Sequence, residues 1–212
     1  MPGGQSELHL YQRDTELSIR VDRAELMNSR ASASENALAE LGCARIRERR
    51  AARVLIGGLG MGFSLRTALD VLQPDAQVIV AELVPAVVRW NRDHLGHLAN
   101  HPLRDPRVSV QELDVAKLIR GAQHELDAIL LDVDNGPAGL TRSANDNLYT
   151  RAGLSAARAA LKSGGVLGIW SAAEDRAFVQ RMRDAEFEVE QISLRGRGSK
   201  GARHTVWLAT PT

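Results

Sequence analysis

A short apolar run that ends in a cluster of glycines constrains the fold of this 212-residue chain more than any other feature. Residues 54–56 (Val-Leu-Ile) lead into residues 57–62 (Gly-Gly-Leu-Gly-Met-Gly), and residues 63–72 follow with helical spacing. A strand, a glycine turn and a helix in this order are typical of doubly wound α/β sheets, which bind nucleotides at such a turn. Because Phe63 stands where the dinucleotide motif has its third glycine, the turn favours a nucleoside with an uncharged or zwitterionic tail over NAD.

The rest of the chain repeats this alternation. Apolar runs at 78–81, 107–111, 126–131 and 166–170 alternate with helical patterns at 85–95, 115–119, 151–161 and 175–184. Continuous apolar strands that alternate with helices predict a mainly parallel sheet with both faces covered. The last two apolar runs, 187–194 and 204–209, have no helix between them and predict a closing antiparallel hairpin.

The first 33 residues differ from the rest. Residues 8–27 alternate apolar and polar side chains, which predicts a small β hairpin or meander. Ser34 is then expected to cap a helix that continues through residues 45–50. We therefore expect an N-terminal β appendage over residues 1–33 and a nucleotide-binding domain over residues 34–212.

Composition narrows the function classes. The chain has 27 Lys plus Arg and 26 Asp plus Glu, so its net charge of +1 gives no overall attraction to nucleic acid or membranes. We expect the basic stretches 45–53 and 195–203 to be solvated charges rather than an RNA surface. Cys43 is the only cysteine, which excludes an intrachain disulfide and a cysteine metal cage, and His94, His97 and His101 lack a metal-ligand spacing. With no signal segment and no apolar run long enough to span a bilayer, a cytoplasmic location is expected.

Acidic residues follow three of the expected strands. Glu82 ends the second strand, where a carboxylate can accept hydrogen bonds from two ribose hydroxyls. Asp114 follows the third strand and is placed either to accept from an adenine amino group or to cap a helix. Asp132 and Asp134 follow the fourth strand and would face the reactive end of a bound nucleotide, so we expect the catalytic group among them.

These features resemble the S-adenosylmethionine-dependent transferases, and their order resembles the spermidine synthase-like aminopropyltransferases. The matching pieces are the N-terminal β segment, Ser34-Glu35, residues 54–58 with Arg66, Asp105-Pro106-Arg107-Val108, and the Asp132 loop that ends in Gly136-Pro137 before Leu148-Tyr149. The resemblance implies a three-layer Rossmann-like domain, S-adenosylmethionine or its decarboxylated form as co-substrate, no metal, a small amine acceptor, and a possible homodimer. The residues that it assigns are Gly57, Gly58, Gly60, Gly62, Glu82 and Asp114 for the nucleoside, Asp132 and Asp134 for catalysis, and Glu35 and Tyr149 for the acceptor.

Two departures from the family pattern bear on the donor. Met61 stands where the family carries an Asp that receives the aminopropyl ammonium, and the family's D-x-x-D is shortened to Asp132-x-Asp134. Fewer acids weaken the attraction for a polycation, and Met61 does not repel the carboxylate of intact S-adenosylmethionine. The sequence therefore slightly favours methyl transfer to a small amine. Aminopropyl transfer from the decarboxylated donor and a non-catalytic nucleotide sensor or partner subunit are the alternatives.

Overall fold

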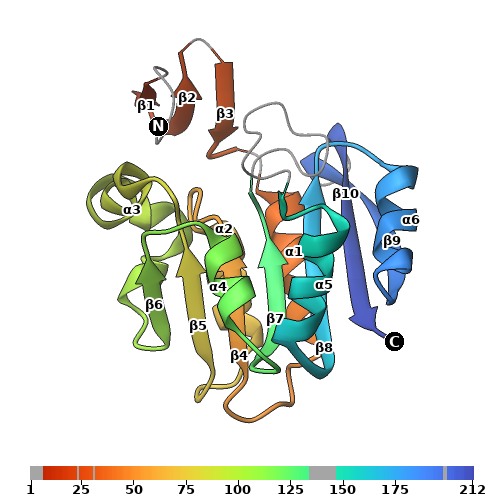
Figure 1. Cartoon of the computed structure of the whole chain (residues 1–212). Coiled ribbons are helices and arrows are strands. Elements are labelled where there is room, and N and C mark those ends of the chain that lie inside the picture. The colour runs from red at the N-terminus through yellow and green to blue at the C-terminus, as the bar shows by residue number, and fades with distance from the viewer. Residues whose placement is uncertain (1–6, 23, 31, 134–146, 198–199) are drawn as a thin grey trace.

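A seven-stranded sheet forms the centre of the computed structural model, which describes residues 7–22, 24–30, 32–133, 147–197 and 200–212 (Figure 1). Its strands are β4 (Arg53–Gly57), β5 (Gln77–Ala81), β6 (Val108–Gln111), β7 (Leu126–Leu131), β8 (Leu161–Ser171), β9 (Phe187–Arg197) and β10 (Lys200–Pro211). The spatial order is β6-β5-β4-β7-β8-β10-β9. Strands β4 to β8 pair in parallel, whereas β10 runs antiparallel to both β8 and β9. The predicted sheet and its closing hairpin are confirmed.

Helices cover both faces of this sheet and complete three layers. The helices α4 (Val115–Gly121), α5 (Arg151–Ala160) and α6 (Arg176–Asp184) contribute to the core on one face. The helices α1 (Ala33–Ala44), α2 (Phe63–Val71) and α3 (Pro85–Trp90) contribute to the core on the other. The central strand β7 is buried along its whole length, as its largely apolar sequence predicts, and its one charged residue, Asp127, is paired with Arg49 and Lys162.

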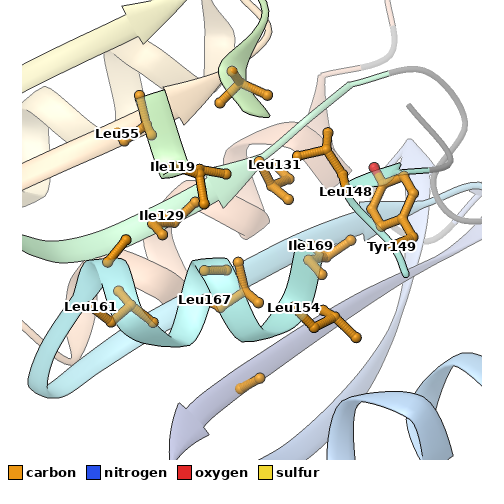
Figure 2. Packing of buried hydrophobic residues seen from close by; sticks show 14 of the residues in the cluster. Leu55, Ile119, Ile129, Leu131, Leu148, Tyr149, Leu154, Leu161, Leu167 and Ile169 are labelled. Atoms are coloured by element: carbon orange, nitrogen blue, oxygen red, sulfur yellow. The ribbon is translucent and has the colours of Figure 1, made fainter. Parts of the chain in front are cut away.

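Figure 2 shows part of the core beneath α4 and α5. Ile129 of β7, Leu167 of β8 and Leu154 of α5 are each at most 1% exposed. Burying a leucine or isoleucine side chain stabilises a fold by about 1.5–3 kcal/mol, and many buried leucines and isoleucines share these two cores. The strands are therefore rigid supports for the loops at their carboxyl ends.

The N-terminal residues form a separate antiparallel sheet of β1 (Leu8–Arg13), β2 (Glu16–Val21) and β3 (Ala24–Asn28), as expected. It lies beyond the carboxyl ends of the parallel strands (Figure 1). Leu17 and Ile19 of β2 are buried in one cluster with Met61 of the glycine turn. The small sheet thus packs directly on that turn. The boundary between residues 33 and 34 remains a prediction.

Two expectations for the first helix are wrong. Helix α1 begins at Ala33 after Ser32, and the Ser34 side chain lies inside the helix, where its Oγ is 2.8 Å from Nδ1 of His204. The helix also ends at Ala44, and turns follow over residues 45–51. Tighter turns replace the helix there, in which the Ile46 N–H donates to the Cys43 carbonyl at 3.0 Å and the Arg49 N–H to the Ile46 carbonyl at 2.9 Å.

The expected helix 85–95 is also interrupted. Helix α3 ends at Trp90 and continues as a π-helical turn, Asn91–Leu95. Asn91 donates from Nδ2 to the Gly60 carbonyl at 2.8 Å and to the Val87 carbonyl at 3.0 Å. Single π turns occur often at functional sites, and this one holds the glycine turn in place.

Candidate active site

The glycine turn between β4 and α2 requires its glycines. Gly58, Gly60 and Gly62 have φ angles of 90°, 51° and 86°, in the left-handed region that favours glycine. A Cβ on Gly58 would lie 2.3 Å from the carbonyl oxygen of Asp132. A Cβ on Gly57 would contact Val115 and Leu131. The backbone of the turn therefore packs against the end of β7, where Asp132 begins the next loop.

Glu82 supports this turn from the neighbouring strand. Its side chain is buried, with Oε2 accepting from the Leu59 N–H at 3.0 Å and Oε1 from the Val84 N–H at 2.8 Å. Burial raises the pKa of Glu82, and the backbone donors partly offset that rise. Sequence reasoning placed Glu82 at the right strand end but missed its bonds to the turn. Its contact with a ribose remains a prediction.

Asp114 follows β6 and caps helix α4. Its Oδ1 accepts from the Ala116 N–H at 2.8 Å, which is the capping geometry that the sequence left open as an alternative. The capping bond uses Oδ1 and leaves Oδ2 for a contact with a base. The adenine role of Asp114 also remains a prediction.

Asp132 is the acid most firmly held at this edge of the sheet. Its N–H donates to the Gly57 carbonyl at 2.9 Å, and its Oδ2 accepts from the Ser64 hydroxyl of α2 at 2.8 Å. Burial raises the pKa of Asp132 to about 6, although the Ser64 hydrogen bond acts in the opposite direction. A carboxylate with this pKa is a better proton acceptor near neutral pH than an ordinary aspartate.

Glu35 lies in the first turn of α1 and forms an acidic pair with Asp132. The Ser64 hydroxyl that binds Asp132 is also 3.3 Å from the Glu35 carbonyl oxygen. Burial, and secondarily the negative charge of Asp132, raise the pKa of Glu35 well above its usual range. Among the described residues, Glu35 Oε2 is buried without a hydrogen-bond partner, and no cationic side chain forms an ion pair with either acid. Two buried carboxylates without a counter-charge are a favourable place for a cationic amine.

Of the other two expected site residues, only Tyr149 lies among the described residues. Asp134 lies outside the described residues, as do Gly136 and Pro137. Tyr149 is buried in the core, with its ring 5.6 Å from that of Phe178 and its hydroxyl 3.5 Å from the Val133 carbonyl (Figure 2). The Tyr149 hydroxyl contacts the residue that follows Asp132. The burial of Tyr149 does not favour direct contact with an acceptor.

The basic stretch that follows α1 is neutralised. Arg45, Arg49, Arg50 and Arg53 form ion pairs with Glu190, Asp127, Asp75 and Glu125, respectively. These pairs leave little free positive charge in this stretch for nucleic acid, and the absence of an RNA surface stays a prediction. The part of the chain that the structure describes contains no cluster of three metal-ligating side chains. In that same part, no helix is long and apolar enough to cross a membrane. The cytoplasmic location and the homodimer stay predictions.

A parallel sheet with a glycine turn after β4 and acids after β5, β6 and β7 defines a Rossmann-like domain of the S-adenosylmethionine transferase type. Residues 34–185 match the model of the spermine/spermidine synthase domain. The chain belongs to this family, and the resemblance in the sequence is thereby confirmed.

Individual relatives agree with this assignment. A curated polyamine aminopropyltransferase from Korarchaeum cryptofilum (strain OPF8) is 28% identical over 115 residues, which are 54% of this chain and 34% of that protein. The chain thus matches about a third of that relative's length. The crystal structure of spermidine synthase from Thermotoga maritima has a TM-score of 0.74 at 18% identity, covering 96% of this chain and 72% of that one. A probable spermidine synthase from Corynebacterium glutamicum ATCC 13032 gives 0.70 at 16% identity, over 98% and 78%. These two structures show the shared fold.

Proposed function

We propose that this protein transfers an aminopropyl group from decarboxylated S-adenosylmethionine to a small amine. The observation that carries this proposal is the buried pair of Glu35 and Asp132, which has no counter-charge among the described residues. The family match and the curated relative support aminopropyl transfer over the methyl transfer that the sequence slightly favoured.

The chain offers suitable groups for the nucleoside. The glycine backbone at residues 58–62 permits close approach, Glu82 lies beside it, and Asp114 keeps one carboxylate oxygen outside its cap. The sulfonium supplies the electrophile, because sulfur leaves as a neutral thioether when the C–S bond breaks. The protein therefore mainly needs to align the attacking nitrogen with that bond.

Asp132 and Glu35 act on the attacking amine. The amine must be unprotonated when its lone pair forms the new C–N bond while the C–S electrons move to sulfur. The nitrogen then carries a positive charge and one proton in excess, which the Asp132 carboxylate accepts. Asp132 is suited to this step because burial brings its pKa to about 6 and Ser64 fixes its orientation. Glu35 stabilises the developing ammonium electrostatically.

Methyl transfer from intact S-adenosylmethionine is the second candidate, and Met61 favours it. The Met61 side chain is 2% exposed and packs with Leu17, Ile19 and Leu95 beneath the N-terminal sheet. In the resembled family an acid at this place receives the aminopropyl ammonium. With Met61 there, neither donor gains or loses a charge contact at this position, so nothing at Met61 repels the carboxylate of the intact donor.

Product formation from the two donors tests the proposal. Purified protein is incubated with a panel of short amines and either donor, and products are resolved by mass spectrometry. We expect amines that carry one added aminopropyl group, formed only with the decarboxylated donor. Methylated amines formed only with intact S-adenosylmethionine would establish the second candidate. Binding of a nucleoside without any product from the panel would count against catalysis and favour a sensor.

A further inference from the structure

A second group of polar side chains begins at Ser34 of α1, the residue before Glu35, and continues on β8 and β10, which the proposed mechanism does not use. Ser34 is buried, and its Oγ is 2.8 Å from Nδ1 of His204 on β10. The imidazole of His204 meets the Trp170 indole of β8 edge-on, with ring centroids 4.8 Å apart. Val206, two residues after His204, is directly paired with Trp170, so both rings stand on the face of the sheet that α1 covers.

Glu35, which follows Ser34, and Trp170, whose ring meets that of His204, each hold a buried polar atom without a partner among the described residues. One is Oε2 of Glu35, which when ionised can only accept a hydrogen bond, and the other is Nε1 of Trp170, which can only donate one. Buried polar groups without partners are rare in proteins, and each calls for an explanation such as a missing ligand. A single molecule that donates at Glu35 and accepts at Trp170 would satisfy both atoms.

The charges of this second group limit which chemical group a bound molecule can carry at the end away from Glu35. Ser34, His204 and Trp170 include no carboxylate, so a second ammonium would find no counter-charge among them. Burial lowers the pKa of His204, which keeps the imidazole neutral near pH 7. A carboxylate on the bound molecule would therefore find no cation at His204. A neutral oxygen, such as a hydroxyl, suits both the indole N–H and the imidazole.

We infer that the amine acceptor carries a hydroxyl oxygen at the end away from the attacking nitrogen, where it accepts from Trp170 Nε1, so that short amino alcohols are preferred over diamines. This inference rests on the proposed function, because it takes Glu35 and Asp132 as the place of the amine. It makes Trp170 a residue that determines acceptor specificity.

The test compares 4-amino-1-butanol with 1,4-diaminobutane, which differ only in the far group. Aminopropyl transfer to each is measured as kcat/KM for the unaltered protein, for Trp170→Phe, and for Trp207→Phe as a control. The control also removes an indole N–H, but one that is paired with Gln191 in the core. We expect the amino alcohol to be preferred, and Trp170→Phe to lower its kcat/KM by about tenfold, the effect of losing one buried hydrogen bond. The same change should leave the diamine nearly unaffected.

A parallel binding experiment separates this inference from the proposed function. Each amine is titrated into the protein in the presence of 5′-methylthioadenosine, the nucleoside product of aminopropyl transfer. Tighter binding of the amino alcohol that depends on Trp170, without turnover, would overturn the function and keep the specificity. A diamine that is equally good or better in both experiments, or an equal loss for both amines in Trp170→Phe, would overturn the inference. Absence of both binding and turnover would overturn both.

Discussion

The hydroxyl of Ser64 lies 2.8 Å from Oδ2 of Asp132 and joins the first turn of α2 to the end of β7. The bond fixes the carboxylate that we propose as proton acceptor, and it counteracts the effect of burial on the pKa of Asp132. Because Ser64 lies two residues after Gly62, the same short segment shapes the nucleoside site and orients the acid.

Replacing Ser64 with alanine should shift the pH dependence of turnover. Without the hydroxyl, the pKa of Asp132 rises above its value of about 6, so the acidic limb of the kcat profile moves to higher pH. We expect the loss of activity to be several times larger at pH 6 than at pH 8. Thr67→Ala is the control, since the Thr67 hydroxyl donates to Oδ1 of Asn36 in α1 at 3.1 Å and not to either acid. An unshifted profile in Ser64→Ala would show that this bond does not tune the catalytic acid.

Asp132→Asn should make the folded protein more stable above pH 6. The folded pKa of about 6 lies above the unfolded value of about 3.9, so the native state holds a proton more tightly. The stability that this proton confers is complete below about pH 4 and is lost as the pH rises through 6. Two pKa units correspond to about 2–3 kcal/mol, which the asparagine variant should gain at pH 8 relative to the wild type. The measurement is Tm against pH for both proteins, and parallel curves would contradict the buried charge.

Glu82 should matter for stability as well as for binding. Glu82→Ala leaves the buried N–H of Leu59 unpaired, at a cost of about 1–3 kcal/mol, and also frees the part-buried N–H of Val84. If Glu82 also binds the ribose, nucleoside affinity should fall by about 2–4 kcal/mol. Denaturant unfolding measures the first effect and calorimetric titration the second. A variant of normal stability would contradict the contacts to the turn, whereas normal affinity in a folded variant would contradict only the ribose contact.

Gly58→Ala should damage the turn that joins β4 to α2. Alanine is strained at a φ of 90°, and its Cβ would meet the Asp132 carbonyl oxygen at 2.3 Å. We expect a loss of more than about 2 kcal/mol in unfolding free energy, together with lost nucleoside binding. The matched control is Gly121→Ala in α4, where a Cβ would meet no atom within 4 Å. Equal stability of the two variants would show that Gly58 is not constrained in this way.

The sequence was most informative where structure depends on local pattern. The strongly apolar run at 126–131 predicts the buried central strand, and the spacing of the glycines at 58, 60 and 62 predicts the turn. Contacts between distant segments leave no periodic signal. Ser64 and Asp132 are 68 residues apart, and Ser34 and His204 are 170 apart, so neither hydrogen bond could be predicted from spacing. Ser34 was expected to cap its helix because serine favours that place, yet the distant histidine takes its hydroxyl.

Turnover by Asp132→Asn tests the central claim most directly. Asparagine keeps the size and one acceptor oxygen of the side chain, but it cannot take up the proton that the amine loses. Product is measured by mass spectrometry in a single turnover with decarboxylated S-adenosylmethionine and an amine that the wild type uses. We predict a rate that is roughly 10²–10⁴ times lower, with nearly unchanged nucleoside affinity. A variant that forms the aminopropylated amine at the wild-type rate would contradict the assignment of Asp132 as the catalytic acid–base group.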